Sequence, residues 1–241
     1  MDRISRRSFF KGAAAAAATA AVAPGCERAP EDSSGQRRPY SFFKADEASF
    51  IEAAVARLIP ADETGPGALE AAVPTYIDRQ LAGAWGAGER LYRSGPWQPG
   101  KPEQGYQLPF TPAELFRNAM RAIIEDLRTT TRGSFAKLQT EDQDAYLRTL
   151  ERETKDLGGV PSNTFFASLL EMTIEGFFSD PIHGGNKGMV GWKLIGFPGA
   201  YANFYELVDQ HGIAFNRPPM SLAQSTGAGD HVHPDPAPKR G

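Results

Sequence analysis

The sequence predicts an all-α fold, a compact helical domain with long loops that are rich in glycine, proline and aromatic residues. Apolar residues recur at helical spacing in five separate stretches, and no stretch alternates apolar and polar residues with β-branched enrichment. The chain of 241 residues also contains 25 glycines and 19 prolines, which lie largely between the helical stretches. Helices joined by irregular loops account for all of these observations.

The first two helices are expected near the start of the body. From Ala45 to Ile59 the apolar residues fall three and four positions apart, and Pro60 ends the pattern because it cannot continue a helix. Pro74 can open a second helix, since its missing N–H and fixed φ suit the first turn, and Gly83 lies near the end of that helix.

Three further helices follow a long loop. Residues 83–111 hold glycines, prolines and aromatic rings, and loops this long in compact domains are usually functional. A wide apolar stripe predicts a helix over Thr111–Leu127. Thr140–Gln143 matches the capping-box pattern and opens a charged helix that extends to about Asp156. The last strong helix is expected over about Ser162–Phe178.

The composition excludes several classes of protein. A formal net charge of -3 and a pI near 5.9 argue against a nucleic-acid binder, which normally carries a basic excess. No apolar run reaches the roughly 18 residues of a membrane-spanning helix. A single cysteine excludes an intrachain disulfide, an iron–sulfur cluster and a C-x-x-C-H haem attachment.

The N-terminus has the pattern of a twin-arginine signal peptide. Arg6 and Arg7 lie in the S-R-R-x-F-x-K setting of that export route, and residues 12–23 form a short alanine-rich run. We therefore expect export by the twin-arginine translocase to the periplasm or the outer face of the cytoplasmic membrane. Cys26 follows small residues, which leaves two alternatives: lipidation of Cys26, or cleavage near Ala23 that leaves a free thiol.

The sequence divides into four parts. Residues 1–25 are the predicted signal peptide, and residues 26–44 form a polar linker whose N-terminus can carry the lipid. Residues 45–215 are the helical domain, and residues 216–241 form a flexible C-terminal tail.

Motifs for catalysis and cofactor binding are missing from the body. No G-x-G-x-x-G follows a strand, and no phosphate loop, H-E-x-x-H or G-x-S-x-G occurs. His231 and His233 lie in a tail rich in Gly, Pro and Asp, where we interpret them as solvated. Asp62 and Glu63 follow a helix and a proline, which favours turn and cap roles. The sequence therefore predicts no catalytic residue, no metal site and no cofactor bound by this chain.

The segment from Gly176 to Gly199 contains seven glycines, two prolines and several large apolar residues. Glycines permit left-handed turns and close backbone approach, and aromatic rings either pack such a chain internally or present it to another protein. Both interpretations stay open. Asp180 and Asn186 are assigned mainly to turn and cap geometry. The candidate partner-binding residues, whose three large aromatic members are the expected buried anchors, are Asp180, Pro181, Gly184, Gly185, Asn186, Trp192, Phe197, Pro198 and Trp97.

Several blocks of the chain resemble one known family. Gly176–Asn186 followed by Gly191–Gly199 looks like the characteristic sequence of the gluconate 2-dehydrogenase subunit 3 family. Leu58–Glu63 and Tyr76–Leu81 resemble its N-terminal block, and Arg132–Leu138 resembles its middle block. The resemblance runs in order through most of the helical domain. Among many relatives an aromatic residue stands at the position of His183, which weakens a special role for that histidine.

The resemblance implies a non-catalytic small subunit of a sugar, gluconate or glycoside dehydrogenase complex. In such complexes a large flavoprotein of the glucose–methanol–choline type carries FAD and the catalytic residues, and a cytochrome c subunit with haem c often completes the assembly. The small subunit is thought to assist maturation, export and stability of the flavoprotein. A body without a cofactor motif is consistent with this role, since its leader then serves a partner that needs folded export.

Two alternatives remain at this stage. The chain could be a stand-alone periplasmic hydrolase or isomerase that uses Asp180 and His183, with Asp62 as a further carboxylate. Such an enzyme needs a water-excluding pocket with convergent polar groups. The chain could also be a lipid-anchored scaffold that tethers a dehydrogenase at a membrane through Cys26.

Overall fold

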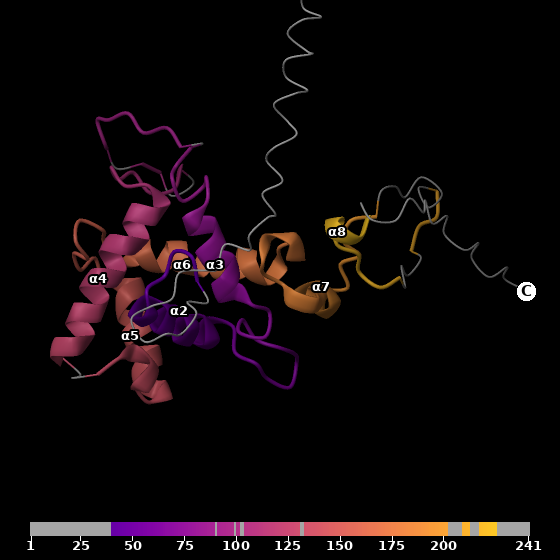
Figure 1. Ribbon diagram of the computed structural model, residues 1–241, viewed down its shortest axis with the longest axis horizontal. Coiled ribbons are helices and arrows are strands. Elements are labelled where there is room, and N and C mark those ends of the chain that lie inside the picture. Colours follow the sequence, from indigo (N-terminus) through magenta and orange to yellow (C-terminus); the bar gives the residue numbers. More distant parts are fainter. Residues whose placement is uncertain are drawn as a thin grey trace, which may run out of the picture. The chain divides into compact units, whose positions relative to one another are not determined.

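A computed structural model describes residues 40–89, 91–98, 100–101, 104–130, 133–201, 209–212 and 217–225 of the chain. All of them belong to the unit that begins at Tyr40. Among these residues the secondary structure is helical, and the β-type pairing consists of isolated bridges without a strand (Figure 1). The predicted all-α class is confirmed. No helix within the described ranges has the length and hydropathy needed to cross a membrane.

The first two helices match their predicted positions. Helix α2 spans Ala45–Leu58, and the side chain of Glu47 accepts a hydrogen bond from the backbone N–H of Lys44 at 2.8 Å, which satisfies a donor at the helix start. Helix α3 spans Val73–Ala82 with Pro74 in its first turn. Each helix turns its apolar face into the core.

The structure corrects the predicted position of the capping box. Helix α4 spans Pro112–Thr130, and it is this helix that has the reciprocal pair: Thr111 N–H donates to Glu114 Oε2 at 2.8 Å, and Glu114 N–H donates to Thr111 Oγ1 at 3.1 Å. Helix α5 spans Thr140–Arg152, shorter than predicted, and begins after Gln139 without a side-chain cap. The side chain of Gln143 donates instead to the carbonyl of Phe135 at 3.0 Å, in the short 3₁₀ helix η2 (Phe135–Lys137).

Helix α6 spans Ser162–Phe178, as predicted, and contacts α2, α3, α4 and α5 (Figure 1). The fully buried ring of Phe165 on α6 lies with its centroid 5.3 Å from that of Phe116 on α4 and 6.3 Å from that of Phe50 on α2. Because neighbouring helices cover α6 on several sides, α6 has apolar residues on most of its surface, and its sequence is strongly apolar. The core is therefore built around α6.

Residues 40–44 are part of the folded unit, although the predicted linker includes them. The buried carboxylate of Asp78 on α3 accepts hydrogen bonds from the backbone N–H groups of Ser41, Phe42 and Phe43 at 2.7 to 3.0 Å. Arg117 on α4 donates to the carbonyl of Phe42 at 2.8 Å and stacks over its ring. These contacts connect the start of the body to two helices.

The predicted tail also has a described part with defined contacts. Residues 217–225 include the short helix α8 (Leu222–Ser225), and Gly199 and Met220 form an isolated bridge. Ala200 N–H donates to the Met220 carbonyl at 2.7 Å, and Met220 N–H donates to the Pro198 carbonyl at 3.1 Å. This part of the chain therefore returns to the end of the segment that began at Gly176.

Candidate functional site

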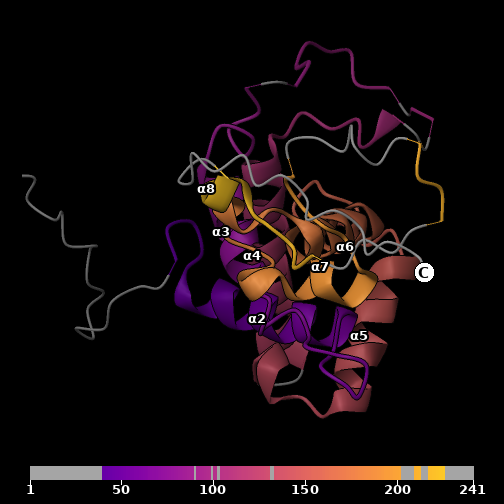
Figure 2. The same cartoon turned by 90° about the vertical axis from the view of Figure 1, so that its right-hand side faces the viewer.

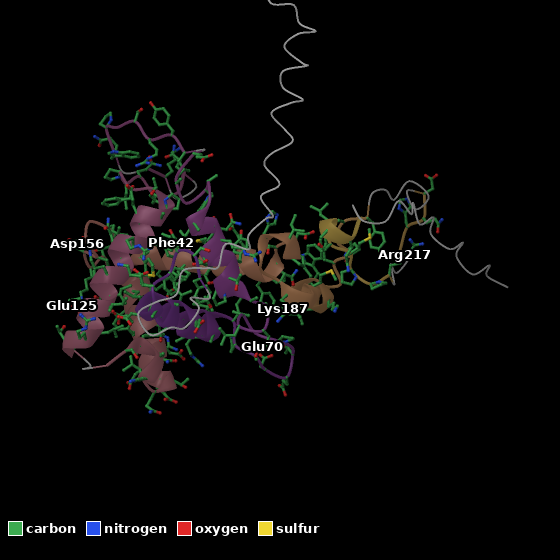
Figure 3. All side chains as sticks on the ribbon, in the orientation of Figure 1. Phe42, Glu70, Glu125, Asp156, Lys187 and Arg217 are labelled. Atoms are coloured by element: carbon green, nitrogen blue, oxygen red, sulfur yellow. The ribbon has the colours of Figure 1, made fainter. Side chains whose placement is uncertain are left out.

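The glycine-rich segment, defined here as residues 179–199, begins where α6 ends. It contains the 3₁₀ helices η3 (Pro181–His183) and η4 (Lys187–Met189) and the short helix α7 (Val190–Ile195). Helix α7 contacts α6, and Figure 2 shows the two side by side. Lys187 N–H donates to the carbonyl of Ala71 at 3.0 Å, so this segment lies beside the loop before α3; Figure 3 shows Lys187 close to Glu70 of that loop.

Asp180 caps the first turn of this segment, as predicted. Its Oδ1 accepts hydrogen bonds from Ile182 N–H at 3.0 Å and from Ser221 Oγ at 2.7 Å, and its Oδ2 accepts one from Leu222 N–H at 2.8 Å. Partial burial opposes ionisation of the carboxyl, but these hydrogen bonds outweigh it and hold the pKa of Asp180 below its usual value. The carboxylate is therefore a structural anion with three donors.

Asn186 is fully buried and connects three parts of the backbone. Its Nδ2 donates to the Ser179 carbonyl at 2.9 Å, its Oδ1 accepts from Gly191 N–H at 2.8 Å, and its own N–H donates to the Gly176 carbonyl at 2.9 Å. Its φ of 44° is left-handed, a conformation that asparagine tolerates better than most residues. The predicted turn role is confirmed.

The glycines permit the chain to pack closely on itself. A Cβ on Gly185 would lie 2.1 Å from the carbonyl oxygen of Gly176, and a Cβ on Gly191 would lie 2.3 Å from that of Phe177. Gly184 has a φ of 99° and lies against the side chain of Arg79. These close approaches are intramolecular, so the glycines fix the shape of the segment.

Trp192 is buried within the chain itself, with 6% of its surface exposed. Its Nε1 donates to the Phe178 carbonyl at 2.7 Å, and its ring meets that of Phe197 edge-on at 5.2 Å between centroids. Pro181 opens η3, and the carbonyl of Pro198 accepts the hydrogen bond from Met220. The buried ring of Trp192 therefore packs against the partly exposed ring of Phe197.

Large apolar side chains remain exposed on the same segment. The exposed fractions are 43% for Ile182, 50% for Leu194, 60% for Ile195 and 45% for Phe197. Single exposed apolar residues are common on protein surfaces, but four within sixteen consecutive residues are not explained by internal packing. We call these four side chains the apolar surface of the glycine-rich segment.

The loop of residues 83–111 presents a second group of exposed large apolar side chains. Trp85, Leu91 and Tyr92 are exposed, whereas the predicted anchor Trp97 is partly buried. Near the start of this loop the backbone of Gly86 packs against the carbonyl of Leu81, and Ala113 N–H donates to the Gly86 carbonyl at 3.0 Å. The loop is therefore attached at the junction of α3 and α4.

The residues weighed for catalysis have structural partners or lie in solvent. Asp62 accepts hydrogen bonds from the backbone N–H and the hydroxyl of Thr64, and the hydroxyl and backbone donors together lower the pKa of this exposed carboxyl. His183 is exposed at the end of η3. The turn role predicted for Asp62 is confirmed.

The structure adds a titratable pair that sequence reasoning missed. Tyr76 on α3 donates its hydroxyl to Glu175 Oε2 on α6 at 3.2 Å, next to the close contact between Tyr76 and Gly176. Desolvation raises the pKa of Glu175, and the nearby Glu171 adds to this, while the hydrogen bond from Tyr76 opposes it. Desolvation also raises the pKa of Tyr76. No local motif marks this pair, because its members lie 99 residues apart.

The described residues contain no group of three or more His, Cys, Asp or Glu side chains that could bind a metal ion. A cleft of about 310 Å³ lies between the start of α2, the end of α4 and η2, lined by residues that include Asp46, Arg128 and Lys137. Its lining includes no residue of the glycine-rich segment.

Several predicted residues lie outside the described part of the chain. These are Arg6 and Arg7 of the export signal, Cys26, Arg132, and the pair His231 and His233.

Comparison with known proteins gives one match. The family model described as gluconate 2-dehydrogenase subunit 3 matches residues 45–199, which includes every described helix except α8 and ends with the glycine-rich segment. A search among curated proteins and a search among solved structures found no match.

Proposed function

The chain belongs to the gluconate 2-dehydrogenase subunit 3 family, and on that premise we propose that it is the non-catalytic small subunit of an FAD-dependent sugar, gluconate or glycoside dehydrogenase complex. The family name designates a subunit of a multi-subunit dehydrogenase. In this proposal the partner is a flavoprotein of the glucose–methanol–choline type, which carries the FAD, and a cytochrome c subunit with haem c can complete the complex.

The observation that carries this proposal is the apolar surface of the glycine-rich segment. Ile182, Leu194, Ile195 and Phe197 are exposed on a backbone whose shape is fixed by Asn186 and by close glycine contacts. A rigid surface with large apolar side chains loses little conformational entropy when a partner covers it. Such a surface is better suited to binding another protein than to catalysis.

The polar groups near this surface favour the same conclusion. Asp180, the carboxylate considered for a stand-alone hydrolase or isomerase, has both oxygens engaged by three donors, which leaves it poorly placed to activate water. His183 is exposed to solvent rather than enclosed in a pocket. General acid–base catalysis needs a base within hydrogen-bond reach of a bound substrate, in a site that excludes water.

We place the complex in the periplasm or at the outer face of the cytoplasmic membrane. The twin-arginine pattern around Arg6 and Arg7 supports export in the folded state, and a flavoprotein that acquires FAD before export requires such a route. In this proposal the small subunit binds the folded flavoprotein in the cytoplasm and the two cross together. Lipidation of Cys26 would then tether the complex to the membrane.

The test is the cellular location of the flavoprotein. We expect the Arg6→Lys/Arg7→Lys double variant, co-expressed with the flavoprotein encoded by the same organism, to leave the flavoprotein in the cytoplasm, still co-purifying with the tagged small subunit. The wild-type chain is the control and brings both to the periplasm. Normal export of the flavoprotein with the double variant would contradict the escort role, and failure of the two wild-type chains to co-purify would contradict the complex itself.

A further inference from the structure

Residues 220–222, in the middle of the C-terminal segment 217–225, contact both ends of the glycine-rich segment. At the far end, Met220 exchanges backbone hydrogen bonds with Pro198 and Ala200. At the near end, Ser221 Oγ and Leu222 N–H both donate to the carboxylate of Asp180, at 2.7 and 2.8 Å. Figures 1 and 2 show α8 beside this part of the chain in both views.

One carboxylate therefore positions two exposed apolar residues. Asp180 accepts the N–H of Ile182 through Oδ1 and the N–H of Leu222 through Oδ2. The side chain of Leu222 is 47% exposed, close to the fraction for Ile182. Because both amides bind the same carboxylate, Ile182 and Leu222, which are 40 positions apart in sequence, are held a few ångströms from a common point. Leu222 thereby extends the apolar surface of the glycine-rich segment.

The charges around this surface indicate the kind of partner it fits. Lys187, Lys193 and His183 are exposed, and Asp180, the single acidic residue of the glycine-rich segment, is already engaged by its three donors. This segment is thus locally basic in a chain whose net charge is -3. Complementary charge favours a partner with carboxylates bordering an apolar recess.

We propose that residues 217–225 and the glycine-rich segment form one composite docking surface for the catalytic flavoprotein, with Asp180 as the positioning residue that joins its two parts. This inference rests on the function proposed above and adds a specificity element to it. Residues 217–225 lie outside the range of 45–199 that the family model matches. The added segment gives this chain a way to select its own flavoprotein among related ones, because specificity is a difference in affinity between partners.

The test compares leucines of similar exposure in the full chain. Purified wild-type chain and the variants Leu222→Asp and Leu91→Asp are titrated with the flavoprotein of the same organism, and the Kd is measured. We expect Leu222→Asp to weaken binding about tenfold or more, since it places a charge in an apolar contact. Leu91, 42% exposed on the 83–111 loop, is the matched control, with an expected change of less than about twofold.

The outcomes separate this inference from the function on which it rests. Absence of binding by the wild-type chain would overturn the proposed function and the composite surface together. Wild-type binding with an unchanged Kd for Leu222→Asp would overturn the composite surface alone, and a weakened Leu91→Asp beside a normal Leu222→Asp would assign the contact to the 83–111 loop instead.

The positioning role of Asp180 has its own measurement in the isolated chain. In Asp180→Asn the side-chain amide has a single acceptor oxygen. It therefore cannot accept hydrogen bonds from the N–H groups of Ile182 and Leu222 on two separate oxygens, as the carboxylate does. We expect faster hydrogen exchange at the Leu222 amide, weaker flavoprotein binding, and an unchanged thermal midpoint of the helical body. Unchanged exchange at that amide would overturn the positioning role.

Discussion

The helical body and the glycine-rich segment differ in the interactions that fix their backbone. Around α6 the rings of Phe50, Phe116 and Phe165 are buried in the core. In residues 179–199 the amide of Asn186 is fully buried, whereas Leu194 and its apolar neighbours face solvent. The body is stabilised mainly by apolar burial, and the segment takes its shape from hydrogen bonds and from glycines packed against backbone carbonyls.

This difference explains why the segment can be rigid and apolar on the outside. Its backbone is fixed by Asn186, by the close contact between Gly185 and Gly176 and by the buried Trp192, so its other large apolar side chains can stay exposed. In the helical body the large apolar side chains cannot be exposed in this way, since its buried rings stabilise the fold. Substitutions in the two regions are therefore expected to act on different properties of the protein.

The largest effect on stability is expected in the body. Phe165→Ala leaves a cavity between α2, α4 and α6, and we expect the free energy of unfolding to fall by about 3 to 5 kcal/mol. Denaturant unfolding followed by circular dichroism measures this. Leu194→Ala, an exposed residue of the apolar surface, is the control and should change the free energy by no more than about 0.5 kcal/mol. Similar losses for the two variants would contradict the contrast between the regions.

An intermediate effect is expected where the segment packs on its own backbone. In Gly185→Ala the new Cβ would lie 2.1 Å from the Gly176 carbonyl oxygen, so the backbone must shift, and we expect a loss of about 1 to 3 kcal/mol. Gly65→Ala is the matched control, because its Cβ would meet only the side chain of Leu194, at 3.5 Å. Thermal unfolding with hydrogen exchange over residues 179–199 measures both. Equal stability of the two variants would show that the segment is more adaptable than its contacts indicate.

The smallest effect is expected at the boundary between the regions, where Tyr76 contacts Glu175. The pKa of Glu175 is raised in the folded state, so the folded protein binds this proton more tightly than the unfolded chain does. Ionisation of Glu175 therefore lowers the free energy of unfolding as the pH rises above the ordinary pKa of a glutamate. Glu175→Gln removes this cost, and the amide oxygen can still accept from Tyr76. We expect the variant to match the wild type near pH 4 and to exceed its free energy of unfolding slightly at pH 7. A difference of the opposite sign would contradict this assignment.

Local patterns in the sequence were sufficient to predict much of the fold. The helices α2, α3 and α6 lie where apolar spacing and prolines place them, and the cap at Asp180 follows from the Asp-Pro turn pattern. The capping box is an instructive error, because Thr111 and Glu114 have the same pattern as Thr140 and Gln143. Both are local signals, and the choice between them depends on what surrounds each helix start.

The sequence by itself therefore determined the all-α class, the helix positions and the presence of an unusual glycine-rich segment, since each follows from interactions within a few residues. Only the tertiary structure decided that Trp192 faces the interior and that Ser221 and Leu222 bind Asp180. It also decided which apolar side chains of the segment stay exposed. The physical reason is that burial depends on neighbours that are distant in sequence, and spacing along the chain does not specify them.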